Sequence, residues 1–319
     1  MDQAMTKTDY GNVRVLLVLE NPIVRQGLRD TLKQAGFPKT FDLTTADSLN
    51  LALNEENFDL IVMTTEVGED FVAPLIGDLR EGRLSHHPFP VVIQLLMSSE
   101  KDYVRKVIDS GPDDILRLPV APGQILARAA ALTQRRRPFV VTLDYTGPDR
   151  RQENRPASPE VPLVEVPNPL SARVNRTPED VFHAEVERSR ARLRSLKRDR
   201  YALELLWLDR AVQQLFQEGP KDTERLAGFA QRLKAAVQQV PELVAGARVA
   251  DLARHLQGGA DILARSGFAV DARVLQRLSS LQIGLAREIR SAPMIERPDP
   301  RTAALFGDAG GEGRPAAPN

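Results

Sequence analysis

The sequence lacks cysteine, and it contains only four histidines among 319 residues. Without cysteine there can be no disulfide, thiolate metal site or cysteine nucleophile. It also lacks the run of about 18 apolar residues that a membrane-spanning helix needs, and its start, "MDQAMTKTDYGN", contains no signal-peptide core. Basic and acidic residues number 43 each, so attraction to nucleic acid or an anionic membrane would require a local patch. We therefore expect a cytoplasmic protein with no membrane span.

The motifs of common enzyme classes are also missing. The sequence has no P-loop, GxSxG elbow, HExxH pair or GxGxxG after a strand, and four histidines without cysteine leave few nucleophile–base pairs. The adjacent His86 and His87 have no acidic or cysteine partner near them in sequence, so we expect a solvated loop rather than a metal site. The sequence thus predicts no enzyme, no cofactor, and neither catalytic nor metal-binding residues.

Short apolar runs alternate with helical patterns from Val13 to about Arg137. The runs "VRVLLVL" (13–19), "FDLIVMT" (58–64) and "FPVVIQLLM" (89–97) are typical of strands buried on both faces. Five strand–helix units in series predict an α/β fold, a doubly wound five-stranded parallel sheet with helices on both faces. Sites in that class lie beyond the carboxyl ends of the strands.

The rest of the chain divides by composition. Residues 1–11 are predicted to be a disordered N-terminus before a first domain at 12–137. A proline-rich linker is predicted at 138–180, in which Phe139–Leu143 could dock as an extra edge strand. Helical periodicity over 181–291 predicts a small α-helical bundle, and the proline- and glycine-rich 292–319 predicts a disordered tail.

Residues 12–137 resemble the receiver domain of two-component response regulators. The segment "VLLVLENPIVRQGLRDTL" is similar to the family's first strand and helix, and "FDLIVMTTEV" is similar to its third strand. The segment "GPDDILRLPVAPGQILARAAAL" is similar to its last strand and helix, including the turn at Pro119. The resemblance implies a receiver-like fold and a role in two-component signalling.

The residues that carry receiver chemistry are replaced. Receivers bind Mg²⁺ through two acidic residues after the first strand, where this chain has Leu19 and Glu20, and their phosphoacceptor aspartate is here Thr64. The lysine that pairs with the phosphoryl group is Leu118, and the switch Ser/Thr has become a leucine. Threonine cannot form an acyl phosphate, and one carboxylate cannot hold Mg²⁺ tightly. These four positions therefore form a degenerate phosphoacceptor pocket in a pseudo-receiver.

Protein–protein contact is the function that remains. In receivers, partners bind the face made by the fourth helix, fifth strand and fifth helix, which here would include Tyr103, Lys106, Val107 and Leu116. Our leading hypothesis is a non-catalytic signalling adaptor that cannot be phosphorylated. Its expected partner is a protein such as a sensor kinase, a response regulator or a chemotaxis-type component.

The helical region is similar to a histidine phosphotransfer domain that lacks its histidine. In "FAQRLKAAV", Gln231 stands at the histidine position and Lys234 matches the family's lysine. An ordinary helix of these residue types explains the same letters. His255 has glycine rather than lysine three residues later, which favours a surface or half-buried helix residue over a phosphoacceptor.

A basic run leaves a second function open. Residues 188–201, "RSRARLRSLKRDRY", could contact phosphates, which would make the chain a DNA-binding or transcription-associated regulator. Nearby acids and the lack of interleaved aromatic residues favour a solvated helix, so we expect no nucleic-acid partner. The segment Tyr145–Arg155, "YTGPDRRQENR", resembles a short segment found after some receivers and is either a docking element or a charged linker.

Overall fold

The computed structural model describes residues 8–84, 87–151, 161–220 and 222–293. It divides the chain into two compact units, which we treat separately. The described part of the first unit comprises 8–84, 87–140, 145–151 and 161–190, and that of the second comprises 141–144, 191–220 and 222–293. In the described residues, no helix is both long enough and apolar enough to cross a membrane.

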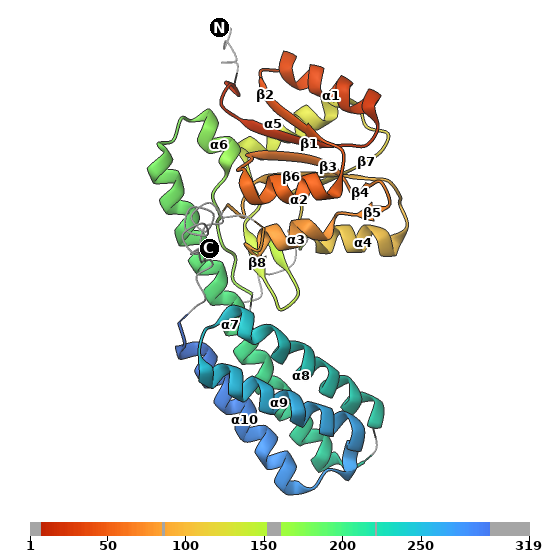
Figure 1. Cartoon of the computed structure of the whole chain (residues 1–319), viewed down its shortest axis with the longest axis vertical. Coiled ribbons are helices and arrows are strands. Elements are labelled where there is room, and N and C mark those ends of the chain that lie inside the picture. Colours follow the sequence, from red (N-terminus) through yellow and green to blue (C-terminus); the bar gives the residue numbers. More distant parts are fainter. Residues whose placement is uncertain (1–7, 85–86, 152–160, 221, 294–319) are drawn as a thin grey trace, which may run out of the picture. The chain divides into compact units, whose positions relative to one another are not determined.

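The first unit is built on a five-stranded parallel sheet, shown between two helical layers in Figure 1. Its order is β2-β1-β3-β6-β7, formed by β2 (Lys39–Leu43), β1 (Arg14–Val18), β3 (Leu60–Thr64), β6 (Val91–Leu96) and β7 (Asp114–Arg117). A short hairpin of β4 (Glu66–Val67) and β5 (Asp70–Phe71) follows β3. The predicted doubly wound sheet is confirmed.

Successive side chains along each strand pack on opposite faces of the sheet. Val15, Leu17 and Val62 pack in one apolar cluster with α1 (Pro22–Gln34) and α5 (Pro122–Gln134). Leu16, Ile61 and their neighbours pack in another with α2 (Ala46–Glu55) and α3 (Pro74–Arg80), and α4 (Lys101–Asp109) lies on that same side (Figure 1). Burial on both faces explains why the strands read as continuous apolar runs.

The proline-rich stretch 138–180 does not behave as the extended linker that we expected. Its described parts form β8 (Phe139–Val141), β9 (Thr146–Pro148) and α6 (Pro169–Val174), and Leu170 is fully buried in the cluster below the sheet's α1–α5 face. Phe139 does not extend the main sheet, because β8 pairs with β9 and forms a bridge to Val164. The short apolar run Phe139–Val141 and the single Leu170 are buried, and the average composition of a proline-rich stretch conceals them.

Two buried arginines fasten this stretch to the first unit. Asp113 is bound by Arg80 at 2.8 Å and by Arg136 at 2.7 Å. Arg136 also donates to the carbonyl of Pro167 at 2.7 Å, and both guanidinium groups lie about 5 Å from the ring centre of Phe139 (5.2 and 5.0 Å). Burial would raise the pKa of Asp113, but the two guanidinium groups outweigh it and hold the pKa below its usual value. The network joins the amino-terminal ends of β6 and β7 to the segment that follows α5.

His87 is buried beside this network, which corrects the solvated loop that we expected for it. Its ring meets Phe182 edge to face at 5.3 Å and Phe89 at 6.1 Å. Burial, with the nearby charges of Arg136 and Arg80, lowers the pKa of His87 to about 3. The imidazole is therefore neutral at physiological pH. His86 lies outside the described residues.

The ends of the chain fall largely outside the described residues. We predicted disorder for residues 1–11, of which residues 1–7 lie outside the described residues. Tyr10 is ordered, because its ring stacks on that of Phe37 with the ring centres 4.2 Å apart. The predicted tail at 292–319 is described only for its first two residues.

The second unit consists of packed helices. The helix α7 (Glu179–Glu218) begins in the first unit's sequence and continues into the second, where α8 (Thr223–Leu243), α9 (Ala247–Ser266) and α10 (Ala272–Ser291) join it. Leu226, Leu233, Val237, Leu278 and Leu285 are buried in its core at helical spacings. The sequence boundary between the units therefore lies within α7, near Arg190, rather than at residue 180.

Candidate functional site

The expected acceptor positions lie together at the carboxyl ends of the central strands. Thr64 is the last residue of β3, Leu19 and Glu20 directly follow β1, and Leu118 directly follows β7. Because β1, β3, β6 and β7 are parallel neighbours, these positions share one edge of the sheet. The strand pattern therefore predicted that these positions share one edge of the sheet, and their roles come from the resemblance alone.

The side-chain hydroxyl of Thr64 contacts backbone carbonyl groups. Its side-chain oxygen lies 2.6 Å from the carbonyl oxygen of Glu66 and 3.2 Å from that of Val18. A hydroxyl has one proton to donate, and both neighbours here accept. With only 6% of Thr64 exposed, this hydroxyl ties the end of β3 to the end of β1.

The rest of the expected pocket is apolar apart from one carboxylate. Leu19 is buried in the cluster that contains α1 and α5, and Leu118 packs against the margin of the same cluster. Glu20 is exposed. In the described part of the chain, no group of three or more acidic or histidine side chains is placed to hold a metal ion.

An arginine that the sequence analysis did not single out lies at this edge. Arg25 of α1 donates to the carbonyl oxygens of Leu19 and Glu20, at 2.6 and 3.0 Å. Its guanidinium also pairs with Asp42 at 3.2 Å. The positive charge thus lies at the two positions where the resemblance would place the ligands of a metal cation. Because helical side chains tilt toward the N-terminus of their helix, an arginine four residues after the N-cap Asn21 was a signal that could have revealed it.

The neighbouring Thr65 makes a second hydroxyl contact at this edge of the sheet. The hydroxyl groups of Thr65 and Tyr103 are hydrogen-bonded, and the Tyr103 ring lies 5.7 Å from that of Phe71. Burial raises the pKa of Tyr103 above its usual value. Tyr103 is therefore anchored to the strand end by both its ring and its hydroxyl group.

The expected partner face is only partly a surface. Lys106 is exposed, Tyr103 is half-buried, and Leu116 packs at the margin of the α1–α5 cluster. Val107 was assigned to this face wrongly: it is 0% exposed and packs with Leu96 and Ala73 beneath α4. The helical periodicity of α4 puts Tyr103 and Val107 one turn apart, and the larger tyrosine reaches the surface while valine does not.

In the second unit, the positions compared with a phosphotransfer helix lie on α8. Gln231 is exposed, and Lys234 pairs with Asp261 of α9 at 2.7 Å. His255 is also exposed, and its Nδ1 lies 2.8 Å from the carbonyl oxygen of Asp251. Lys234 therefore links two helices.

The basic run on α7 has fewer side chains free to contact phosphate groups than its composition indicated. Arg190 and Lys197 are buried, and Arg190 pairs with Glu187 at 2.7 Å. The segment that begins at Tyr145 packs back on the first unit: the Tyr145 hydroxyl donates to the carbonyl of Pro148 at 2.8 Å, and Arg150 donates to that of Pro112. We considered a docking element and a charged linker for this segment, and the described residues 145–151 fit a docking element within the chain.

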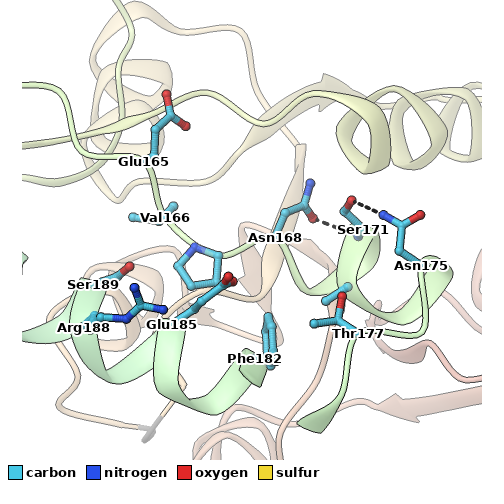
Figure 2. A pocket seen from close by; sticks show the side chains of 12 residues that line it. Glu165, Val166, Asn168, Ser171, Asn175, Thr177, Phe182, Glu185, Arg188 and Ser189 are labelled. Carbon is cyan, nitrogen blue, oxygen red and sulfur yellow. Dashed lines mark hydrogen bonds between the residues drawn. The ribbon is translucent and has the colours of Figure 1, made fainter. Parts of the chain in front are cut away.

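A cleft of about 420 Å³ lies between the stretch around α6 and the first turns of α7. Figure 2 shows its polar lining, in which Asn175 donates to the Ser171 hydroxyl at 3.1 Å. Asn168 uses its amide to cap α6 and to donate to the carbonyl of Leu132 at 2.8 Å. Asn168 thus holds α6 against α5, whereas the bond between Asn175 and Ser171 lies within the α6 segment.

No protein-family model matches the sequence, and no curated protein matches it. Among solved structures, it is similar to response regulator DrrB, a Thermotoga maritima OmpR/PhoB homolog, with 22% identity over 39% of this chain and 53% of that chain and a TM-score of 0.34. The chain thus spans about half the length of that protein. Other similar structures are HP1043, an orphan response regulator of H. pylori (19% identity, 38% of this chain, 96% of that chain, TM-score 0.33), and RcsB from Salmonella enterica serovar Typhimurium bound to promoter rprA (18%, 38%, 74%, 0.31).

The strand order by itself defines the class of the first unit. With the β4–β5 hairpin set aside, the sheet runs second, first, third, fourth, fifth strand, which is the flavodoxin-like doubly wound order. Its ligand edge is the one at which Thr64, Leu19 and Leu118 lie. The chain therefore combines a receiver-like α/β unit with a C-terminal helical unit.

Proposed function

We propose that this chain is a non-catalytic signalling adaptor of a two-component-type pathway and that its first unit is a pseudo-receiver. The observation that carries the proposal is Thr64: a buried hydroxyl engaged with two backbone carbonyls ends the strand on which a receiver presents its acceptor carboxylate. Phosphoryl transfer to a carboxylate requires that carboxylate, a metal ion and a cation for the product. Thr64, Leu19 and Leu118 supply none of these.

The position of Arg25 supports the same proposal. A guanidinium bound to the carbonyls of Leu19 and Glu20 repels a divalent cation from this edge. The function left to the fold is recognition of another protein, through the exposed parts of the face that includes Tyr103 and Lys106. Because no phosphate switches this face, a partner must bind it in the conformation that the chain already has.

Thermal melting with and without millimolar Mg²⁺ tests the proposal. The wild-type midpoint should not respond to Mg²⁺, because no site binds the ion. The variant Leu19→Asp/Thr64→Asp should lose roughly 1–3 kcal/mol of stability through charges forced into an apolar site. Mg²⁺ should restore part of that loss, since it binds only the folded state.

The control is Ser99→Asp, which adds a carboxylate at an exposed position. Its melting midpoint should match that of the wild type and should not respond to Mg²⁺. A clear rise of the wild-type midpoint in Mg²⁺ would mean that the site holds a metal, and the pseudo-receiver proposal would fail.

A further inference from the structure

An exposed apolar patch lies on the second unit. Leu203 and Trp207, one turn apart on α7, are 48% and 47% exposed. The Trp207 indole meets the Phe229 ring of α8 edge to face at 5.5 Å. Large apolar side chains that adjoin one another on the surface of a packed bundle are a feature of binding surfaces. We call these three residues the Trp207 patch.

Arginines frame the Trp207 patch. Arg232 lies 4.9 Å over the indole and pairs with Glu204, which fixes its position. Arg225 lies 5.6 Å over the Phe229 ring, and within the described residues no carboxylate forms an ion pair with it. Tryptophan and arginine dominate the energetics of binding surfaces. The patch therefore fits an apolar segment that is followed by negative charge.

We propose that this segment belongs to the chain itself, and that residues 303–308, "AALFGD", bind the Trp207 patch. Beyond residue 295, Leu305 and Phe306 are the only large apolar residues of the tail. Asp308 and Glu312 follow them. This order of apolar and acidic groups complements the rings and the Arg225 guanidinium.

The chain is long enough for this contact. The carbonyl of Pro293 accepts from the backbone N–H of Ala245 at 3.1 Å, so the tail starts beside the end of α8. Phe229 lies about 24 Å back along that helix at its rise of 1.5 Å per residue. The stretch from Pro293 to Leu305 can span up to about 40 Å. Because the segment is tethered, even weak contacts suffice for binding.

Tryptophan fluorescence of the full chain tests the proposal, since Trp207 is the only tryptophan. In Leu305→Ser/Phe306→Ser the emission should shift to longer wavelength and acrylamide quenching should increase, because the indole becomes more exposed. The control Ala316→Ser/Ala317→Ser should match the wild type. A synthetic peptide of residues 299–315 added to the first variant should reverse both changes. Identical wild-type and variant spectra would overturn the proposal, as would a shift that vanishes on dilution, which would indicate a second copy as the occupant.

A charge exchange tests the acidic part separately. Arg225→Glu should increase quenching, and it is tolerated structurally because it lies in the first turn of α8, where a negative charge is favourable. Adding Asp308→Arg to that variant should return quenching toward the wild-type value. If the double variant quenches as strongly as Arg225→Glu alone, Asp308 does not contact Arg225 and the proposed binding mode is wrong.

Discussion

Asp113 balances two buried positive charges. Arg80 and Arg136 both bind it, and the backbone N–H of Val92 donates to it at 2.8 Å. Asp113→Asn would leave two guanidinium groups buried without a counter-charge. We expect this change to lower the free energy of unfolding by about 3–5 kcal/mol, the usual cost of breaking a buried pair.

Chemical denaturation measures this cost, and an exposed pair provides the control. Asp109 lies 3.8 Å from Arg105 on the surface of α4. Asp109→Asn should change the free energy of unfolding by less than about 0.5 kcal/mol, because exposed pairs contribute little. Equal effects of the two substitutions would show that the Asp113 network does not stabilise the unit.

His87 should make the first unit sensitive to mild acid. Its pKa in the folded chain is about 3, whereas an unfolded histidine titrates near 6.5, so the unfolded state binds more protons between these values. The stability contributed by neutral His87 is fully present above about pH 6.5 and is lost as the pH falls, by about 2 kcal/mol at pH 5. The lowered pKa of Asp113 acts in a separate window, below its unfolded value of 3.8.

Denaturation curves at pH 7 and pH 5 check this prediction. His87→Asn removes the titrating ring, so the difference between the two pH values should shrink by about the same 2 kcal/mol relative to wild type. The comparison cancels the opposing contribution of Asp59, whose pKa burial raises. An unchanged pH dependence in the variant would mean that His87 is charged in the folded chain.

At the scale of elements, the adjacent glycines of "HLQGG" have different roles in α9. A Cβ at Gly259 would lie 3.2 Å from Cγ of Leu278 on α10, whereas a Cβ at the exposed Gly258 would meet no atom within 4 Å. Gly259 thus permits the close approach of two helices.

Alanine at each position separates these roles. Gly258→Ala should raise the free energy of unfolding by about 1 kcal/mol through helix propensity. Gly259→Ala should lower it by about 1–3 kcal/mol through overpacking against Leu278. Thermal melts of the two variants should therefore move in opposite directions. A stabilised Gly259→Ala variant would contradict the close packing.

The strands were predictable because each is a run of apolar residues, and a residue such as Ile61 must be apolar when both faces of its strand are covered. The location of Thr64 at a strand end follows from the same pattern. The contacts of Arg136 could not be assigned in this way, because a polar residue that binds a distant carboxylate has no periodic signal. The stretch 138–180 was misjudged for another reason: its proline-rich composition outweighed the apolar run that begins at Phe139 and the single buried Leu170.

At the scale of the whole chain, the two units have different kinds of free surface. The first has a face that includes the exposed Lys106, next to the sheet edge where Thr64 and Arg25 bind backbone carbonyls. The second has the Trp207 patch. A chain with these features and no acceptor carboxylate on β3 fits a protein that signals by contact.

The central claim is that the receiver-like unit does not accept a phosphoryl group. The direct measurement is intact mass after incubation of the full chain with acetyl phosphate and Mg²⁺, with a phosphorylatable receiver treated in parallel to prove that the donor is active. We expect no addition of about 80 Da, the mass of one phosphoryl group. A stoichiometric, acid-labile adduct located within residues 12–137 would contradict the account.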